Sequence, residues 1–145
     1  MSIQVKILAN GVEIPSYATK NSAGVDLKSN ETFMIFPMER RLVHTGIYME
    51  IPEGYEGQVR PRSGLAIKHG ITVLNSPGTI DADYRGEICV ILYNSNKPGS
   101  GPYSVIKDDN IAQMVFAPVA QAEIIPVVEL SSTERGEGGF GHTGK

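Results

Sequence analysis

Glycine and proline interrupt this chain so often that it has no room for long helices. The longest stretch without either residue runs from Tyr103 to Ala117, and its middle carries Asp108, Asp109 and Asn110, residues typical of turns. Between the interruptions, apolar and polar residues alternate with a period of two, the spacing of a strand with one buried face. The chain is therefore expected to fold mainly from short β-strands.

The alternation predicts strands at 3–7, 47–51, 71–74, 87–93, 113–119 and 122–128. Within 87–93, the run Ile88–Leu92 is apolar on both faces, as in a strand between two layers, so we expect Cys89 to be a buried and inert thiol. Only residues 63–69 favour a short helix, with Ser63 as its N-cap. Many short strands at this spacing predict a single all-β domain, either a sandwich, a jelly roll or a barrel.

The composition argues against several classes of protein. The net charge is −3 and the 13 lysines and arginines are scattered, which argues against binding to duplex nucleic acid. The single cysteine cannot form an intrachain disulfide, and no apolar run reaches the length that crosses a membrane. We therefore expect a soluble protein in a reducing compartment.

The segment Arg135–Lys145 is unusual because five of its residues are glycine, so ordering it costs much conformational entropy. Phe140 in this segment nevertheless suits a flat ring, and Arg135 together with closely approaching backbone N–H groups suits a polyphosphate. A lid that orders on a nucleotide and a disordered polar tail both explain this composition.

The segment Gly78–Ile88 carries two carboxylates, Asp81 and Asp83, between glycines. A β-hairpin explains the glycines, and a turn in which aspartates bond their own backbone explains the carboxylates. Because residues two apart on a strand share a face, the pair could instead bind a metal.

Three other segments hold isolated polar residues. In PRSGLA at 61–66, an arginine, a hydroxyl and a glycine at the start of a helix would make an anion site. The plain alternative is an N-cap beside a solvated arginine. Asp26 and Gln113 interrupt apolar runs, and a satisfied polar residue at a strand end explains each of them alone.

Together these segments are more specific. The chain resembles the trimeric dUTP pyrophosphatases (dUTPases), a family with five short motifs in a fixed order. The matching segments are AGVDL at 23–27, PRSGLA at 61–66, GTIDADYRGEI at 78–88, IAQMV at 111–115 and RGEGGFGHTG at 135–144. The chain departs from the family at Asn110, where the family often has the arginine of Gly-Asp-Arg, and at His142, where serine is common.

The resemblance implies an all-β jelly roll or distorted β-barrel of the β-clip type, with one short helix and a flexible C-terminal tail. Residues 1–134 would form the β-domain and residues 135–145 a Gly-rich lid arm. It also implies a cytoplasmic homotrimer with active sites at the subunit interfaces, in which each tail acts on a neighbouring subunit.

The resemblance further implies hydrolysis of dUTP to dUMP and pyrophosphate by attack of water on the α-phosphorus, which lowers dUTP and supplies dUMP for thymidylate synthesis. Asp81 would be the general base, and Asp83 would shape the turn. Mg²⁺ chelated by the three phosphates would neutralise the leaving pyrophosphate. Asp26 would act through a metal-bound water, with no direct protein ligand to the ion.

The residues implied to contact the substrate fall into three groups. The phosphate-contacting positions are Arg62, Ser63, Gly64 and Gln113. The residues around the third motif that would read the uracil edge and the sugar are Asn75, Gly78, Ile80 and Tyr84, with Tyr84 under the deoxyribose. In the tail, Arg135 would reach the γ-phosphate and Phe140 would stack on uracil, while the residues that close over the phosphates would be Gly141, His142 and Thr143.

Two alternatives belong to other functional classes. A related dCTP deaminase would share the sandwich and the phosphate site, but it needs a different turn around the base. A non-catalytic β module that binds nucleotides would be expected to have lost Asp81, Tyr84 or the tail, and this chain keeps all three.

Overall fold

The computed structural model describes residues 2–144. Met1, in the expected β-domain, and Lys145, at the end of the expected lid arm, lie outside the described residues.

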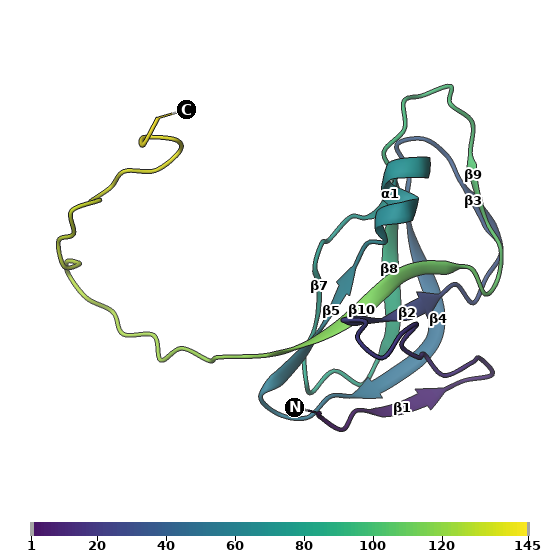
Figure 1. Ribbon diagram of the computed structural model, residues 1–145, viewed down its shortest axis with the longest axis horizontal. Coiled ribbons are helices and arrows are strands. Elements are labelled where there is room, and N and C mark those ends of the chain that lie inside the picture. The colour runs from purple at the N-terminus through teal and green to yellow at the C-terminus, as the bar shows by residue number, and fades with distance from the viewer. Residues whose placement is uncertain (1, 145) are drawn as a thin grey trace.

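The described residues form ten β-strands and one helix (Figure 1). Their order is β1 (Lys6–Ala9), β2 (Gly24–Lys28), β3 (Phe33–Ile35), β4 (Arg40–Glu50), β5 (Tyr55–Arg60), α1 (Ser63–His69), β6 (Ile71–Val73), β7 (Gly78–Ile80), β8 (Glu87–Asn94), β9 (Tyr103–Val105) and β10 (Asn110–Pro118). The strands make two four-stranded sheets, β1-β4-β8-β6 and β2-β10-β5-β7, and a small pair, β3-β9. The all-β prediction with one short helix is confirmed, and the two sheets are consistent with a jelly roll rather than a closed barrel.

Both sheets bury apolar side chains in one core. Leu27 on β2 and Met114 on β10 are fully buried, and so are Val43 on β4 and Leu92 on β8. These side chains come from opposite sheets, so the core lies between the sheets.

Strand β8 has one buried face and one half-exposed face, so the prediction of a strand covered on both faces is wrong. Ile88, Val90 and Leu92 point into the core, whereas Cys89 and Ile91 lie on the half-exposed face. The reason is that the second face of β8 is only partly covered by the part of the chain that the structure describes. Cys89 is therefore not the fully buried thiol that the apolar run suggests.

The helix covers the predicted residues, but its cap differs from the prediction. Ser63 is the first helical residue and Arg62 is the N-cap, with no side-chain hydrogen bond to the helix end. The Arg62 carbonyl instead accepts the first helical hydrogen bond, from the Ala66 amide at 3.1 Å. At the other end Gly70 adopts φ 65°, a conformation that favours glycine and ends the helix. This seven-residue helix, the only one among the described residues, is too short to cross a membrane.

The predicted hairpin over Gly78–Ile88 is also wrong. Strand β7 pairs with β5 in one sheet, whereas β8 pairs with β4 and β6 in the other. The segment between them therefore crosses from sheet to sheet. Asp81 and Asp83 lie in this crossover and not on a strand, so the argument for a metal pair on one strand face does not apply.

After β10 the chain leaves the β-sheets as an extended segment (Figure 1). We call residues 119–144 the C-terminal arm. It contains no helix or strand, so the strand predicted at 122–128 is wrong. Ile124 and Val128 are 84% and 106% exposed, because no strand among the described residues offers this segment an edge to pair with.

Candidate active site

Three of the five motifs meet in one pocket of about 570 Å³, which we call the phosphate pocket. Its lining includes Gly24 and Asp26 from the first motif, Arg62, Ser63 and Gly64 from the second, and Gln113 from the fourth. Strand β10 brings them together because it lies between β2 and β5. Gln113 faces Asp26 on one side and Arg60 on the other.

The amide of Gln113 is held in place from two sides. Its Nε2 donates a hydrogen bond to the Pro61 carbonyl at 3.0 Å. On the other side lies the backbone of Gly24, where an added Cβ would come within 2.9 Å of Gln113 Oε1. Glycine at position 24 is therefore needed for this close approach, and the Gln113 amide is fixed before any ligand arrives.

The guanidinium of Arg62 is anchored at the same pocket. Its Nε lies 3.4 Å from Asp26 Oδ1, and its Nη1 donates to the Asn110 carbonyl at 3.3 Å. Both side chains of the ion pair stay partly exposed, which leaves Arg62 donors directed toward solvent. The arrangement suits a bound anion, since a guanidinium can bind a phosphate while one edge stays anchored.

Sequence reasoning missed three polar residues that also line the phosphate pocket, namely Ser22, Lys68 and His69. Lys68 adds a second cation from the last turn of α1. Its spacing of four residues from Gly64 places both on one face of the helix, and this signal was available in the sequence.

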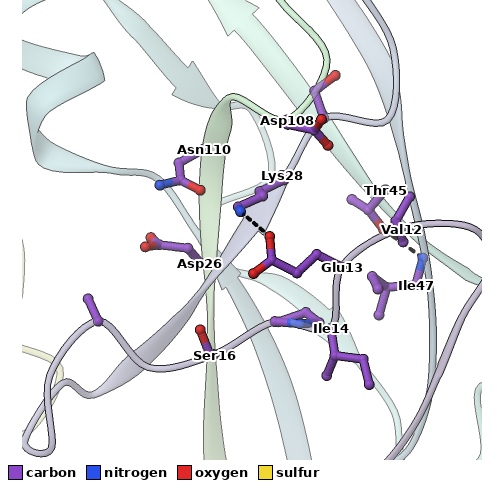
Figure 2. Close-up of a pocket in the computed structure, with 13 residues that line it drawn as sticks. Val12, Glu13, Ile14, Ser16, Asp26, Lys28, Thr45, Ile47, Asp108 and Asn110 are labelled. Carbon is purple, nitrogen blue, oxygen red and sulfur yellow. Dashed lines mark hydrogen bonds and ion pairs between the residues drawn. The ribbon is translucent and has the colours of Figure 1, made fainter.

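Figure 2 shows a smaller cavity, of about 170 Å³. It shares the lining residues Ala18 and Asp26 with the phosphate pocket. Lys28 and Glu13 form an ion pair of 2.8 Å in its wall, and their hydrogen bond raises the pKa of Lys28 and lowers that of Glu13. Asn110, at the position where the family often has arginine, also lines this cavity. Its Oδ1 is buried without a hydrogen-bond partner among the described residues.

Asp81 lies in a different hollow. This hollow has a volume of about 970 Å³, and its lining includes Tyr55, Thr79, Asp81, Asp83 and Val119. Asp81 is exposed, and its carbonyl accepts a hydrogen bond from the Tyr84 amide at 3.1 Å, which closes a tight turn. The hollow and the phosphate pocket have no lining residue in common.

The distance between the two sites follows from the register of β5. Ile80, the residue before Asp81, pairs with Gly57 near the beginning of β5, whereas Arg62 lies just beyond its end. Asp81 is therefore level with Glu56, and the six residue steps from Glu56 to Arg62 span about 20 Å of extended chain. One chain therefore does not place Asp81 next to its own phosphate pocket.

Tyr84 is positioned by a hydrogen bond and by a glycine. Its hydroxyl donates to the Glu87 carbonyl at 2.9 Å, and its ring lies directly against the backbone of Gly86, where any Cβ would collide with it. The ring remains 43% exposed, so one side of it is available to a ligand.

The other residues of this group lie close by. Asn75 is exposed, and its side-chain amide lies close to the buried Gly78. A Cβ added at Gly78 would lie 3.1 Å from the Asn75 amide nitrogen. The Ile80 side chain packs against the core, which leaves its backbone for contact with a ligand.

The predicted tail residues Arg135, Phe140, Gly141, His142 and Thr143 lie far along the arm and line neither site. Phe140 is fully exposed, and the Arg135 Nε donates to the nearby Gly138 carbonyl at 2.8 Å. Gly141 has φ 85°, which is accessible to glycine at low cost.

Most of the chain matches one protein family. A family model described as dUTPase covers residues 10–144. The chain belongs to the dUTPase family. It is 58% identical to the deoxyuridine 5'-triphosphate nucleotidohydrolase of Nautilia profundicola over the full length of both chains. It is 53% identical to the enzyme of the same name from Fusobacterium nucleatum, over 99% of this chain and 98% of that one.

Solved dUTPase structures share the fold. The dUTPase of Staphylococcus bacteriophage 80alpha, solved with dUPNHPP, has a TM-score of 0.92 at 28% identity and covers 99% of this chain and 100% of its own. A mutant dUTPase from phage phi11 of S. aureus has a TM-score of 0.81 at 25% identity, covers 88% of this chain and 98% of its own, and is described as coordinating a structural Mg(II) ion.

The donors of this dUTPase family member fit a Mg²⁺ ion that arrives with a nucleotide. Among the described residues, Asp26 is the one carboxylate that lines the phosphate pocket. Mg²⁺ is commonly held by one or two carboxylates together with substrate phosphates and waters. One carboxylate beside the cationic side chains of Arg62 and Lys68 suits an ion shared with substrate phosphates better than an ion whose ligands all come from the protein.

Proposed function

We propose that this chain hydrolyses dUTP to dUMP and pyrophosphate by attack of water on the α-phosphorus. Its membership of the dUTPase family and the names of relatives that match over their full length support this activity. The observation that carries the proposal is the phosphate pocket, which Arg62, Ser63 and Gln113 together line in the free protein.

The phosphate pocket would bind the triphosphate. The Arg62 guanidinium would pair with phosphate oxygens while Asp26 holds its other edge, and Lys68 would add charge. Ser63 and Gln113 would contribute neutral donors. Mg²⁺, when bound, supplies charge neutralisation at the phosphates, with Asp26 holding a water of the ion.

Asp81 would serve as the general base that orients and deprotonates the attacking water. Because Asp81 lies about 20 Å of chain away from its own phosphate pocket, a second chain must supply one of the two. We therefore infer a homotrimer with active sites at the subunit interfaces. Each site would combine the pocket of one chain with Asp81 of another.

Strand β7 and the segments on either side of it would select the base and the sugar. Asn75 and the backbone of Gly78 and Ile80 would read the uracil edge, which differs from cytosine in its hydrogen-bonding groups. Tyr84, fixed by Gly86 and by the Glu87 carbonyl, would pack under the deoxyribose and leave no space for a 2′-hydroxyl.

The arm would complete the site once substrate is bound. Phe140 would stack on uracil, Arg135 would reach the γ-phosphate, and 141–143 would close over the phosphates. Closure of such a segment excludes water from the reacting phosphate. We propose residues 135–145 as the lid and residues 1–134 as the β-domain, and a cytoplasmic location, where free nucleotides are available.

Pyrophosphate release from dUTP, dCTP, dTTP and UTP tests the activity directly. We expect release from dUTP alone among the four, at least about a hundredfold above the others, because mismatched polar groups would stay unpaired. Ammonia release from dCTP would instead identify the deaminase class. Binding of dUTP without turnover in the presence of Mg²⁺ would identify a non-catalytic module.

A further inference from the structure

A second cluster of chemically active side chains lies on the half-exposed face of the β4–β8 ladder. It consists of His44, Glu87 and Cys89. His44 and Cys89 are direct cross-strand partners, and Glu87 lies two residues before Cys89 on the same face. The imidazole nitrogen, the carboxylate oxygen and the sulfur all lie within 4.8 Å of one another. No other group of three such ligands was found among residues 2–144.

The spacing of these atoms is that of a metal site. His44 Nδ1 lies 3.7 Å from Cys89 Sγ. Two ligands on a tetrahedral Zn²⁺, with bonds of about 2.0 Å to nitrogen and 2.3 Å to sulfur, lie about 3.6 Å apart. The Glu87 carboxylate, now 2.7 Å from His44 Nδ1, would need to move back by less than about 1 Å.

The surroundings hold the carboxylate in this position. Glu87 Oε1 accepts a hydrogen bond from the Gly46 amide at 2.8 Å, which aims Oε2 at the cluster. Gly46 has φ 71° and lies at an irregularity of the β4–β8 register, between His44 and Tyr48. A hydrogen bond of this kind, from the backbone to the carboxylate, orients a metal ligand in advance. The His44 side chain is 52% exposed, so solvent can reach a fourth coordination position.

We propose that His44, Glu87 and Cys89 bind a divalent cation of the Zn²⁺ class, with water as the fourth ligand. Thiolate and imidazole ligands select Zn²⁺ and similar ions over Mg²⁺, so this site is chemically different from a Mg²⁺ ion held by nucleotide phosphates. None of the three residues lines the phosphate pocket or the hollow around Asp81. The ion therefore links β4 to β8 and stabilises the fold without entering the reaction.

Binding releases protons. Burial, with the Glu87 and Glu31 carboxylates, raises the pKa of the Cys89 thiol, so the thiol is protonated near neutral pH. The hydrogen bond that His44 makes to the Glu87 carboxylate raises the pKa of His44, with Glu31 adding to this and Arg41 opposing it. The cation replaces the thiol proton and any proton on Nδ1, which leave to solvent, so its affinity increases with pH.

Titration of the full-length, metal-free protein with Co²⁺ tests the site, because cobalt bound to a thiolate gives a charge-transfer absorption band. We expect one Co²⁺ per chain and a band that Cys89→Ser abolishes. His44→Asn and Glu87→Gln should each weaken Co²⁺ binding by at least about tenfold. The controls His69→Asn and Glu123→Gln remove a histidine and a carboxylate outside the cluster and should leave the titration unchanged.

Thermal unfolding with Zn²⁺ gives a second readout. The midpoint should rise for the wild type and not for Cys89→Ser, and dUTP hydrolysis by the variant would show that it is folded. Should Cys89→Ser misfold, the exposed His44→Asn variant provides the comparison. A cobalt spectrum without the thiolate band, or Co²⁺ affinity that is equal in wild type and His44→Asn, would overturn the proposal.

Discussion

The phosphate pocket and the C-terminal arm both carry residues proposed to touch the substrate, but they are built in opposite ways. In the pocket, Gln113 is fixed by the Pro61 carbonyl and by the backbone of Gly24, and Arg62 is anchored by Asp26. In the arm, Phe140 is fully exposed, and most of the glycines have open space where a side chain would be.

This difference separates binding from closure. A preformed pocket binds phosphates with little ordering cost, because its side chains are already held in place. The glycine-rich arm must lose conformational entropy when it closes, so it should do so only when the nucleotide supplies compensating contacts. The pocket should therefore determine the stability of the free protein as well as phosphate binding, whereas the arm should affect substrate enclosure and catalysis but not the stability of the free protein.

The largest effect is expected at Asp81, which lies outside both regions. Asp81→Asn removes the proposed base and leaves the phosphate pocket intact. We expect kcat to fall by about 10²–10⁴-fold while the Kd for dUTP changes little. Asp83→Asn is the matched control and should cost far less. Near-normal turnover by Asp81→Asn together with loss of turnover by Asp83→Asn would transfer the base role to Asp83.

Deletion of 135–145 tests the contrast between the phosphate pocket and the arm most directly. We expect kcat/KM to fall by about a hundredfold or more, because the reacting phosphate is no longer enclosed and aligned. The unfolding midpoint of the free protein should stay the same, since the hydrogen bonds of residues 135–144 all lie within 133–144. A large drop in that midpoint would show that the arm is part of the folded core of the assembly.

The same substitution, glycine to alanine, can be made in the phosphate pocket and in the arm to compare the two regions. Gly24→Ala places a methyl group against Gln113 and should destabilise the free protein by about 1–3 kcal/mol, the usual cost of overpacking, and raise KM for dUTP. Gly139→Ala meets no atom within 4 Å and should leave the stability unchanged. Denaturant unfolding of both variants measures this, and equal effects would remove the distinction between pocket and arm.

The smallest effect is expected at the pair of His44 and Glu87, in metal-free protein. The pKa of His44 is raised by Glu87, so the stability from this group is present below its unfolded pKa of about 6.5 and is lost as pH rises through the folded value. Burial raises the pKa of Glu87, but the hydrogen bonds from His44 and Gly46 outweigh this and lower it. The stability from Glu87 is therefore lost only as pH falls through that lowered value, below about 4.3.

The pair should thus stabilise the protein most between about pH 4.5 and 6.5, by less than about 1 kcal/mol because His44 is exposed. Unfolding of wild type and His44→Asn across this range measures the difference. The full-length protein and the protein without 135–145 should show the same difference in stability between wild type and His44→Asn, because the pair lies in the β-sheets. A difference that grows above pH 7 would contradict the assignment.

Parts of the fold could be predicted from the sequence because they follow local patterns. Alternation located β6, β8 and β10, but the predicted segments 3–7 and 47–51 cover only two residues of β1 and the end of β4. Ser63–His69 was the one segment that suited a helix. Segments with three strand residues, such as β3, β7 and β9, are too short for a period to show. The segment 122–128 has strand-like alternation but finds no partner strand, and pairing is not a local property.

The site shows the same limit. The motif residues were identified by resemblance, but the sequence did not show which of them share a pocket. It suggested a hairpin after Gly78, whereas β7 and β8 belong to different sheets, and this crossover is what places Asp81 away from Arg62. The close approach of Gly24 to Gln113 and the contact of Gly86 with Tyr84 depend on strand register and local packing, which the sequence does not give.

The central claim is that one chain supplies the phosphate pocket and another supplies Asp81, and co-assembly of two inactive variants tests it. One chain carries Asp81→Asn, and the other carries Arg62→Ala with Gln113→Ala. In a three-fold ring, each mixed trimer contains one site that pairs an intact pocket with an intact Asp81. About three-quarters of randomly mixed trimers are mixed, so dUTP hydrolysis should return to about a quarter of the wild-type rate. If the pocket and Asp81 of the same chain act together, no mixed site is complete, and the mixture will show no more activity than the two variants alone.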